Sequence, residues 1–90
     1  MAKVIIPTPL RKYTNNTSSF EADGGTVQSA IDELTQQYPD LQKQLYDEQG
    51  NIRSFIKVFV GEDDIRNLNN ENTEVDQGTE ISIVPAIAGG

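Results

Sequence analysis

The chain has 90 residues, 36% hydrophobic and 23% charged, with seven lysine and arginine residues against fourteen aspartate and glutamate residues. This length allows one domain with a single modest core. The net charge of −7 argues against binding to nucleic acid or anionic membranes by charge attraction, and makes a basic protein surface the better complement. A solvated face that only keeps the protein soluble explains the same acidity equally well.

The sequence contains no cysteine and no histidine. Thiolate nucleophiles, disulfides, thiolate or imidazole metal sites and histidine general bases are therefore excluded, so the chain is a poor enzyme candidate. We expect no bound cofactor or metal. The segment MAKVIIPTPL lacks the apolar core of a secretory signal, and no window approaches a membrane span. We therefore expect a cytoplasmic protein.

The N-terminal segment predicts a β-hairpin. Residues 3–8, KVIIPT, carry the β-branched run of a first strand, with Pro7 at a bulge or an edge because it lacks a ladder donor. LRKYTNNT, residues 10–17, predicts a turn and loop, and SSFEA, residues 18–22, predicts the second strand.

A helix lying on the sheet is predicted next. Thr26 is the natural N-cap, because its hydroxyl can accept from an amide of the first turn. Pro39 cannot continue this helix but suits the first position of a short second one, PDLQKQLYD. Spacings of three and four define the apolar stripe of the first helix, which comprises Val27, Ala30, Ile31, Leu34 and Tyr38.

Residues 54–60, SFIKVFV, alternate strictly and predict a strand. We assign Ile56, Val58 and Val60 to the core and Phe55, Lys57 and Phe59 to the outward face.

The remaining segments end in another strand. GEDD at 61–64 predicts a turn, IRNL at 65–68 a short edge strand or irregular connection, and NNENTEVDQGT at 69–79 a polar stretch with a turn at DQG. In the final strand, EISIVP, Ile81 and Ile83 lie on one side, with Ser82 and Val84 on the other.

This element order predicts a two-layer α+β domain over residues 1–85. A hairpin, a crossing helix and a return to the sheet describe a mixed four- to five-stranded sheet packed on one main helix. That arrangement is the β-grasp, or ubiquitin-like, architecture.

The acidic turn offers Glu62, Asp63 and Asp64 as hard-cation ligands, but it lacks the spacing of a dedicated loop, so a solvated turn is the better interpretation. Glu21 and Asp23 could act as paired carboxylates, but nothing in the sequence predicts a cleft around them.

Residues 86–90 predict a flexible tail with functional use. Pro85 has no amide to donate, so ladder pairing should finish there, and the five following residues would reach roughly 17 Å. Gly89 and Gly90 lack side chains and suit a narrow channel. The carboxylate of Gly90 becomes reactive once adenylated. The rest of the tail comprises Ala86, Ile87 and Ala88.

Such a tail needs a docking surface on the folded domain. Ordering five residues costs on the order of 5 to 10 kcal/mol of backbone entropy, more than small side chains recover. An exposed apolar patch beside the tail would supply the missing binding free energy. The alternative is that Phe55 or Phe59 covers a loop instead of facing outward. The predicted partner-binding residues are Phe55, Lys57, Phe59 and Val84.

Three segments carry a family resemblance. DQGTEISIVPAIAGG is similar to the closing signature of the ubiquitin-like sulfur carriers of the ThiS and MoaD group, FIKVFVGEDDIR resembles their central strand and turn, and IPTPLRKYT resembles the first hairpin of the CysO branch. Gly61 stands where many relatives have Asn. The resemblance covers nearly the whole chain.

The resemblance implies a mechanism and partners. An adenylating enzyme related to the ubiquitin-activating enzymes would use ATP to activate Gly90, and sulfur from a persulfide donor would leave a thiocarboxylate. The acceptor would be a biosynthetic enzyme, with a cysteine synthase-like enzyme favoured over thiazole or molybdopterin synthesis. Two other classes stay open: a protein modifier that forms isopeptide bonds, and an interaction module with an incidental tail.

Overall fold

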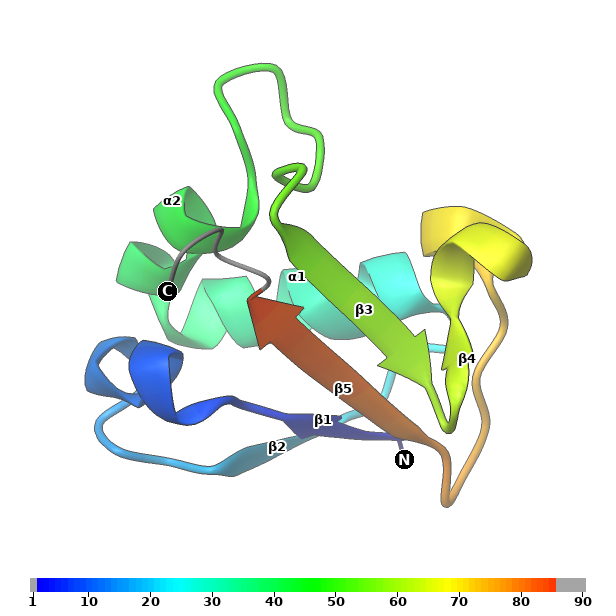
Figure 1. Cartoon of the computed structure of the whole chain (residues 1–90). Coiled ribbons are helices and arrows are strands. Elements are labelled where there is room, and N and C mark those ends of the chain that lie inside the picture. Colours follow the sequence, from blue (N-terminus) through cyan, green and yellow to red (C-terminus); the bar gives the residue numbers. More distant parts are fainter. Residues whose placement is uncertain (1, 86–90) are drawn as a thin grey trace.

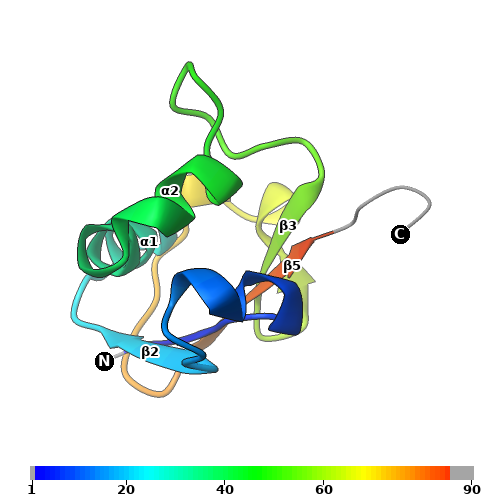
Figure 2. The ribbon, with the colours of Figure 1, turned by 90° about the vertical axis from the view of Figure 1, so that its left-hand side faces the viewer.

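The computed structural model describes residues 2–85. They form two layers, with helices on one face of a five-stranded sheet, as Figures 1 and 2 show from two directions. The elements in chain order are β1 (Ala2–Ile5), η1 (Thr8–Tyr13), β2 (Ser19–Ala22), α1 (Val27–Gln37), α2 (Pro39–Leu45), β3 (Ile56–Val60), β4 (Asp63–Asp64), η2 (Ile65–Asn67), η3 (Asn70–Asn72) and β5 (Glu80–Pro85), the η elements being 3-10 helices.

The sheet has the strand order β2-β1-β5-β3-β4. β1 and β5 are parallel, and the other neighbours are antiparallel. The predicted mixed sheet and the β-grasp arrangement are therefore confirmed. The terminal strand β5 occupies the centre, between β1 and β3.

Helix α1 begins where the sequence predicts. The Thr26 hydroxyl accepts from the Ser29 amide at 3.2 Å, and the Ser29 hydroxyl accepts from the Thr26 amide at 3.1 Å. This reciprocal capping box satisfies two amides of the helix start. The buried stripe of the helix then packs on the sheet through Val27, Ala30, Ile31 and Leu34.

A segment without a predicted element also holds α1 in place. The Val27 amide donates to the Thr73 carbonyl, and the Val75 amide donates to the Gly25 carbonyl, each at 2.9 Å. Thr73 and Val75 are both buried. Part of the polar stretch 69–79 is thus a structural clamp across the start of α1.

Several predicted boundaries are wrong at the N-terminal end. β1 ends at Ile5 instead of residue 8, and Pro7 lies between β1 and η1 rather than at a bulge or an edge. A 3-10 helix replaces part of the expected loop, because buried Leu10 anchors it in the core.

Other boundaries move in the second half of the chain. α2 ends at Leu45, since the following residue, Tyr46, has extended backbone. The edge strand is Asp63–Asp64, inside the predicted turn, whereas Ile65–Asn67 is a 3-10 helix. β3 starts at Ile56, two residues later than predicted.

Candidate functional site

The strand that leads to the predicted tail is held on both sides. β5 pairs with β1 along one edge and with β3 along the other, and Pro85 lies opposite Ile56 at the last described position. The ladder therefore fixes where this strand points. The predicted tail of Ala86, Ile87, Ala88, Gly89 and Gly90 lies outside the described residues, so its flexibility and the role of Gly90 stay predictions.

The sheet face turned away from α1 carries a mixed patch. The register puts Lys57 directly opposite Val84 and Phe59 opposite Ser82. Side chains that are opposite or diagonal on one face of a sheet lie within reach of each other. Val84 is 41% exposed, while Lys57 and Phe59 are half-buried. We call Lys57, Phe59 and Val84 the open-face patch; it unites three of the four residues predicted to bind a partner.

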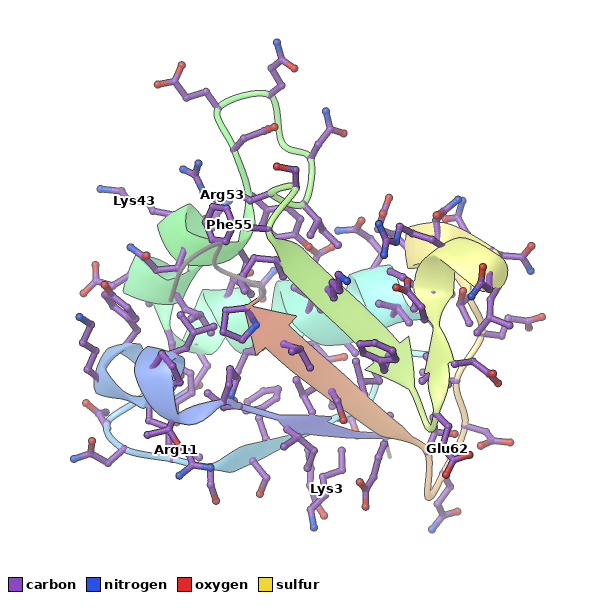
Figure 3. All side chains as sticks on the ribbon, in the orientation of Figure 1. Lys3, Arg11, Lys43, Arg53, Phe55 and Glu62 are labelled. Atoms are coloured by element: carbon purple, nitrogen blue, oxygen red, sulfur yellow. The ribbon has the colours of Figure 1, made fainter. Side chains whose placement is uncertain are left out.

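Phe55 does not belong to the strand that was predicted to carry it. The Ile56 amide donates to the Arg53 carbonyl at 2.9 Å, which closes a turn around Phe55 before β3 starts. The ring is 39% exposed and borders a shallow pocket with Arg53. Figure 3 shows it near Arg53 and Lys43, at the far end of β3 from Glu62. Phe55 thus lies in the turn before β3, outside the strand alternation that was predicted to place it beside Lys57 and Phe59.

Sequence reasoning missed one neighbour of the open-face patch. Ile5 pairs with Ser82 across the parallel β1–β5 ladder, so its half-buried side chain lies on the same face. Because neighbouring residues of a strand point to opposite faces, the succession of Val4 and Ile5 was a signal that one of the two side chains faces away from the core. Val4 is the buried one. The adjacency of β1 and β5 was not readable, because these strands lie at opposite ends of the chain.

The edge strand β4 carries two carboxylates, and Arg66 neutralises one of them. Asp64 lies opposite Phe59 and forms an ion pair with Arg66, with 2.8 Å between Oδ2 and Nη2. Hydrogen bonds from the Arg66 side chain and amide lower the pKa of Asp64. This carboxylate is therefore stabilised in its charged form at the β4 end of the patch.

The carboxylates that the sequence analysis considered and set aside all lie within the described residues. Within residues 2–85, no three His, Cys, Asp or Glu side chains gather in an arrangement suited to a metal ion. In the same described part, no helix is both long and apolar enough to cross a membrane. Neither observation tests the expected cytoplasmic location, which stays a prediction.

The five-stranded mixed sheet, covered by α1 on one face and open on the other (Figure 1), defines a ubiquitin-like β-grasp protein. The sequence model of the ThiS family matches residues 4–90, and the chain therefore belongs to the ThiS family. It is 33% identical over 89 residues to the sulfur carrier protein CysO of Mycobacterium bovis, an alignment that covers 97% of this chain and 96% of that protein. It is thus a ubiquitin-like sulfur carrier.

Two solved structures illustrate the likeness. A chain in the crystal structure of the Amycolatopsis orientalis BexX/CysO complex matches with a TM-score of 0.90 and 36% identity, covering 100% of both chains. The solution structure of small archaeal modifier protein 1 from Methanosarcina acetivorans matches with a TM-score of 0.86 and 26% identity, covering 99% of this chain and 95% of that one.

Proposed function

We propose that this sulfur carrier holds its sulfur as a thiocarboxylate on Gly90. The Gly90 carboxylate attacks ATP in an adenylating enzyme, displaces pyrophosphate and forms an acyl-adenylate. A donor of the persulfide class then displaces AMP, and a second thiol cleaves the resulting S–S bond by reduction. The thiocarboxylate left on Gly90 carries the sulfur to a biosynthetic enzyme, and ATP is used by the activating enzyme.

The family match to residue 90 is the observation that carries this proposal, because it includes Gly89 and Gly90. The chain has no cysteine, so no side-chain thiol is available to hold the sulfur. The pairing of β5 adds support, since β3 holds this strand as far as Pro85 and the tail therefore starts from a fixed point.

The open-face patch supplies the binding energy for the activating enzyme in this proposal. Val84 immediately precedes Pro85, so a partner that covers Lys57, Phe59 and Val84 stands beside the root of the tail. Burying an aromatic and an aliphatic side chain offsets part of the entropy lost when the tail is ordered. The similar chain in the BexX/CysO complex supports binding to a second protein.

A cysteine synthase-like enzyme is the acceptor we favour. The similarity to CysO over nearly the whole chain supports this choice over the thiazole and molybdopterin pathways. Purified thiocarboxylate protein, offered with an activated serine to such an enzyme from the same host, should then yield cysteine. Transfer to a thiazole or molybdopterin enzyme instead would reassign the acceptor but leave the carrier mechanism intact.

Protein modification is the second candidate function. The likeness to small archaeal modifier protein 1 supports it, because a protein named as a modifier shares the fold at 26% identity. Both functions use an activated C-terminal glycine, and they differ in whether sulfur or a lysine amine attacks it. Conjugates of higher mass that disappear when Gly89 and Gly90 are deleted would favour the modifier.

Intact mass spectrometry after treatment with a thiol-alkylating reagent tests the proposal. The protein is taken from its host, or incubated with ATP, a sulfur donor and host extract. Because the chain has no cysteine, an adduct that maps to the terminal peptide identifies the thiocarboxylate and separates it from oxidised Met1. Deletion of Gly89 and Gly90 should remove the adduct without unfolding the domain. An unmodified terminal peptide under all these conditions would contradict the proposal.

A further inference from the structure

The two edges of β3 are used very differently. Along the β5 side, all five residues of β3 are paired. Along the other side, the two-residue strand β4 pairs only with Phe59 and Val60. Figure 1 shows β4 beside the carboxyl-terminal part of β3, leaving the first part of that edge without a strand. The backbone of Ile56–Val58 is therefore open to pairing on this side.

The ladder register identifies which backbone groups face the open edge. The Gly61 amide donates to the Glu80 carbonyl, so this pair belongs to the hydrogen-bonded set of the antiparallel β3–β5 ladder. Alternate residues back along β3, including Lys57, also face β5. The Val58 amide and the Ile56 carbonyl consequently point to the β4 side. One residue of an added parallel strand could donate its amide to the Ile56 carbonyl and accept from the Val58 amide.

A groove of about 280 Å³ lies along this open edge. Its far wall comes from η2 and η3, through Ile65 and Asn70. The apolar part of its lining comprises half-buried Ile52 and the edges of three core side chains, Ile56, Val58 and Ile65. The groove therefore combines an unpaired strand edge with an apolar floor, the two features on which recognition by strand addition depends.

The charges around the groove are unlike those of the rest of the chain. Three cations, Arg53, Lys57 and Arg66, line it against two carboxylates, Asp64 and Glu71, in a chain of net charge −7. The ion pair present in the described part of the chain joins Arg66 to Asp64. Lys57 projects on the open face beside the groove. Its charge also helps to lower the pKa of Asp64, but the ion pair of that carboxylate is made with Arg66. An added acidic group opposite Lys57 would therefore meet a positive charge that is not held in an ion pair within residues 2–85.

We propose that this groove binds an extended segment of a partner protein, which adds to β3 as a parallel strand and places an acidic residue opposite Lys57. The amide of that acidic residue donates to the Ile56 carbonyl, and its carbonyl accepts from the Val58 amide. Because strand side chains alternate, the residues on either side of it point to the helix side of the sheet, onto the apolar floor. The pattern recognised is apolar, acidic, apolar.

This surface does not compete with the tail for the same strand edge. β5, from which the tail continues, lies on the opposite side of β3 from the groove. A partner segment in the groove therefore leaves both ladders of β5 intact. The inference also stands apart from thiocarboxylate chemistry, because it requires only the folded domain.

An NMR titration of the ¹⁵N-labelled full chain tests the proposal. The probe is the capped pentapeptide Ac-Ser-Val-Asp-Val-Ser-NH2, which carries the predicted pattern. We expect saturable shifts centred on the Val58 amide, with a dissociation constant on the order of 1 mM, and slower hydrogen exchange of that amide. Shifts that map to β2, or no saturable shift, would overturn the proposal.

Two altered peptides separate strand addition from binding by side chains. Methylation of the Asp amide nitrogen keeps every side chain but removes the donor for the Ile56 carbonyl, so we expect binding to be lost. Replacement of Asp by Lys should also abolish binding, because like charges would face each other at Lys57. If the methylated peptide binds as well as the parent, the groove accepts side chains alone and strand addition is wrong.

A matched pair of protein variants completes the test. Lys57→Glu should weaken the binding of the parent peptide about tenfold, because an opposite-charge pair becomes a like-charge pair. Lys12→Glu makes the same charge change on η1, outside the groove, and should leave binding unchanged. Equal weakening by both variants would show a general charge effect and contradict the proposal. Deletion of Gly89 and Gly90 should leave peptide binding intact whatever its effect on sulfur transfer.

Discussion

The two faces of the sheet have opposite roles although the same strands build both. On the face covered by α1, Val4, Ile81 and Ile83 are almost completely buried, with exposed fractions of 0%, 0% and 2%. On the open face, the intervening side chains of β5 and β3 are half-buried or exposed. One face stabilises the fold, and the other is available for recognition. A single residue step along a strand therefore separates a core position from one on the face that we propose binds a partner.

The largest expected effect comes from comparing neighbours on β5. Ile83→Ala should lower the free energy of unfolding by about 2 to 5 kcal/mol, because it leaves a cavity under α1. Val84→Ala, one residue along, should change it by less than about 0.5 kcal/mol, since Val84 is 41% exposed and truncating it leaves no closed cavity. Urea denaturation of both variants measures the contrast. Similar losses in the two variants would mean that the open face is also part of the core.

Two adjacent glycines test how closely the segment between β2 and α1 packs against the helix. A Cβ on Gly24 would lie 2.6 Å from the Ser29 Cβ, whereas a Cβ on Gly25 would meet nothing within 4 Å. Glu33 also accepts from the amides of Asp23 and Gly24 at 2.9 and 2.6 Å, which fixes this segment against the helix. Gly24→Ala should therefore cost about 1 to 3 kcal/mol.

Gly25→Ala is the matched control for that substitution. It should shift the thermal midpoint little, because its site is open and its backbone is not left-handed. Scanning calorimetry compares the two variants. A harmless Gly24→Ala would show that the start of α1 can shift away from the hairpin, and that the covered face tolerates a looser helix.

A charge on the open face should affect activation rather than folding. Val84→Asp removes an apolar group from the open-face patch, and we expect it to reduce the rate of acyl-adenylate formation at limiting enzyme about tenfold, the equivalent of about 1.4 kcal/mol. The melting temperature should stay near that of the parent. ATP–pyrophosphate exchange with the host adenylating enzyme measures the rate. An unchanged rate would separate the patch from activation.

The smallest effect at neutral pH concerns a polar group on the covered side. Burial, followed by the nearby Asp32 charge, raises the pKa of Tyr46 from 10.0 to about 12. Its hydroxyl lies 3.2 Å from Nε2 of Gln28, which donates to it. Because the folded state holds this proton more tightly, the resulting stability is present below pH 10 and is lost as the pH rises toward 12.

Tyr46→Phe isolates this contribution. At pH 7 the variant should lose about 0.5 to 1.5 kcal/mol through the missing hydrogen bond. Between pH 9 and 12, its stability should fall less steeply than that of the parent. Denaturant titrations across that range compare the slopes, and parallel slopes would mean that Tyr46 ionises as easily in the folded protein as in the unfolded one.

Local patterns predicted much of the fold but not every boundary. The Thr26 cap and the apolar stripe of α1 and the alternation of β5 involve neighbours within a few residues, and both elements appear as expected. The start of β3 was misplaced because the alternation continues through Phe55, whereas the Arg53–Ile56 hydrogen bond closes a turn there. A pattern of side chains cannot report a turn made by backbone groups.

The sequence by itself determined the main helix with its buried stripe, the alternation of the central strands and three of the residues on the open face. Tertiary structure alone decided that Ile5 borders this patch and that β4 is too short to cover the edge at Ile56–Val58. The reason is physical: periodicity records which side of an element is apolar, whereas strand adjacency depends on contacts between distant segments. Both the neighbours of β5 and the groove beside β3 are products of such contacts.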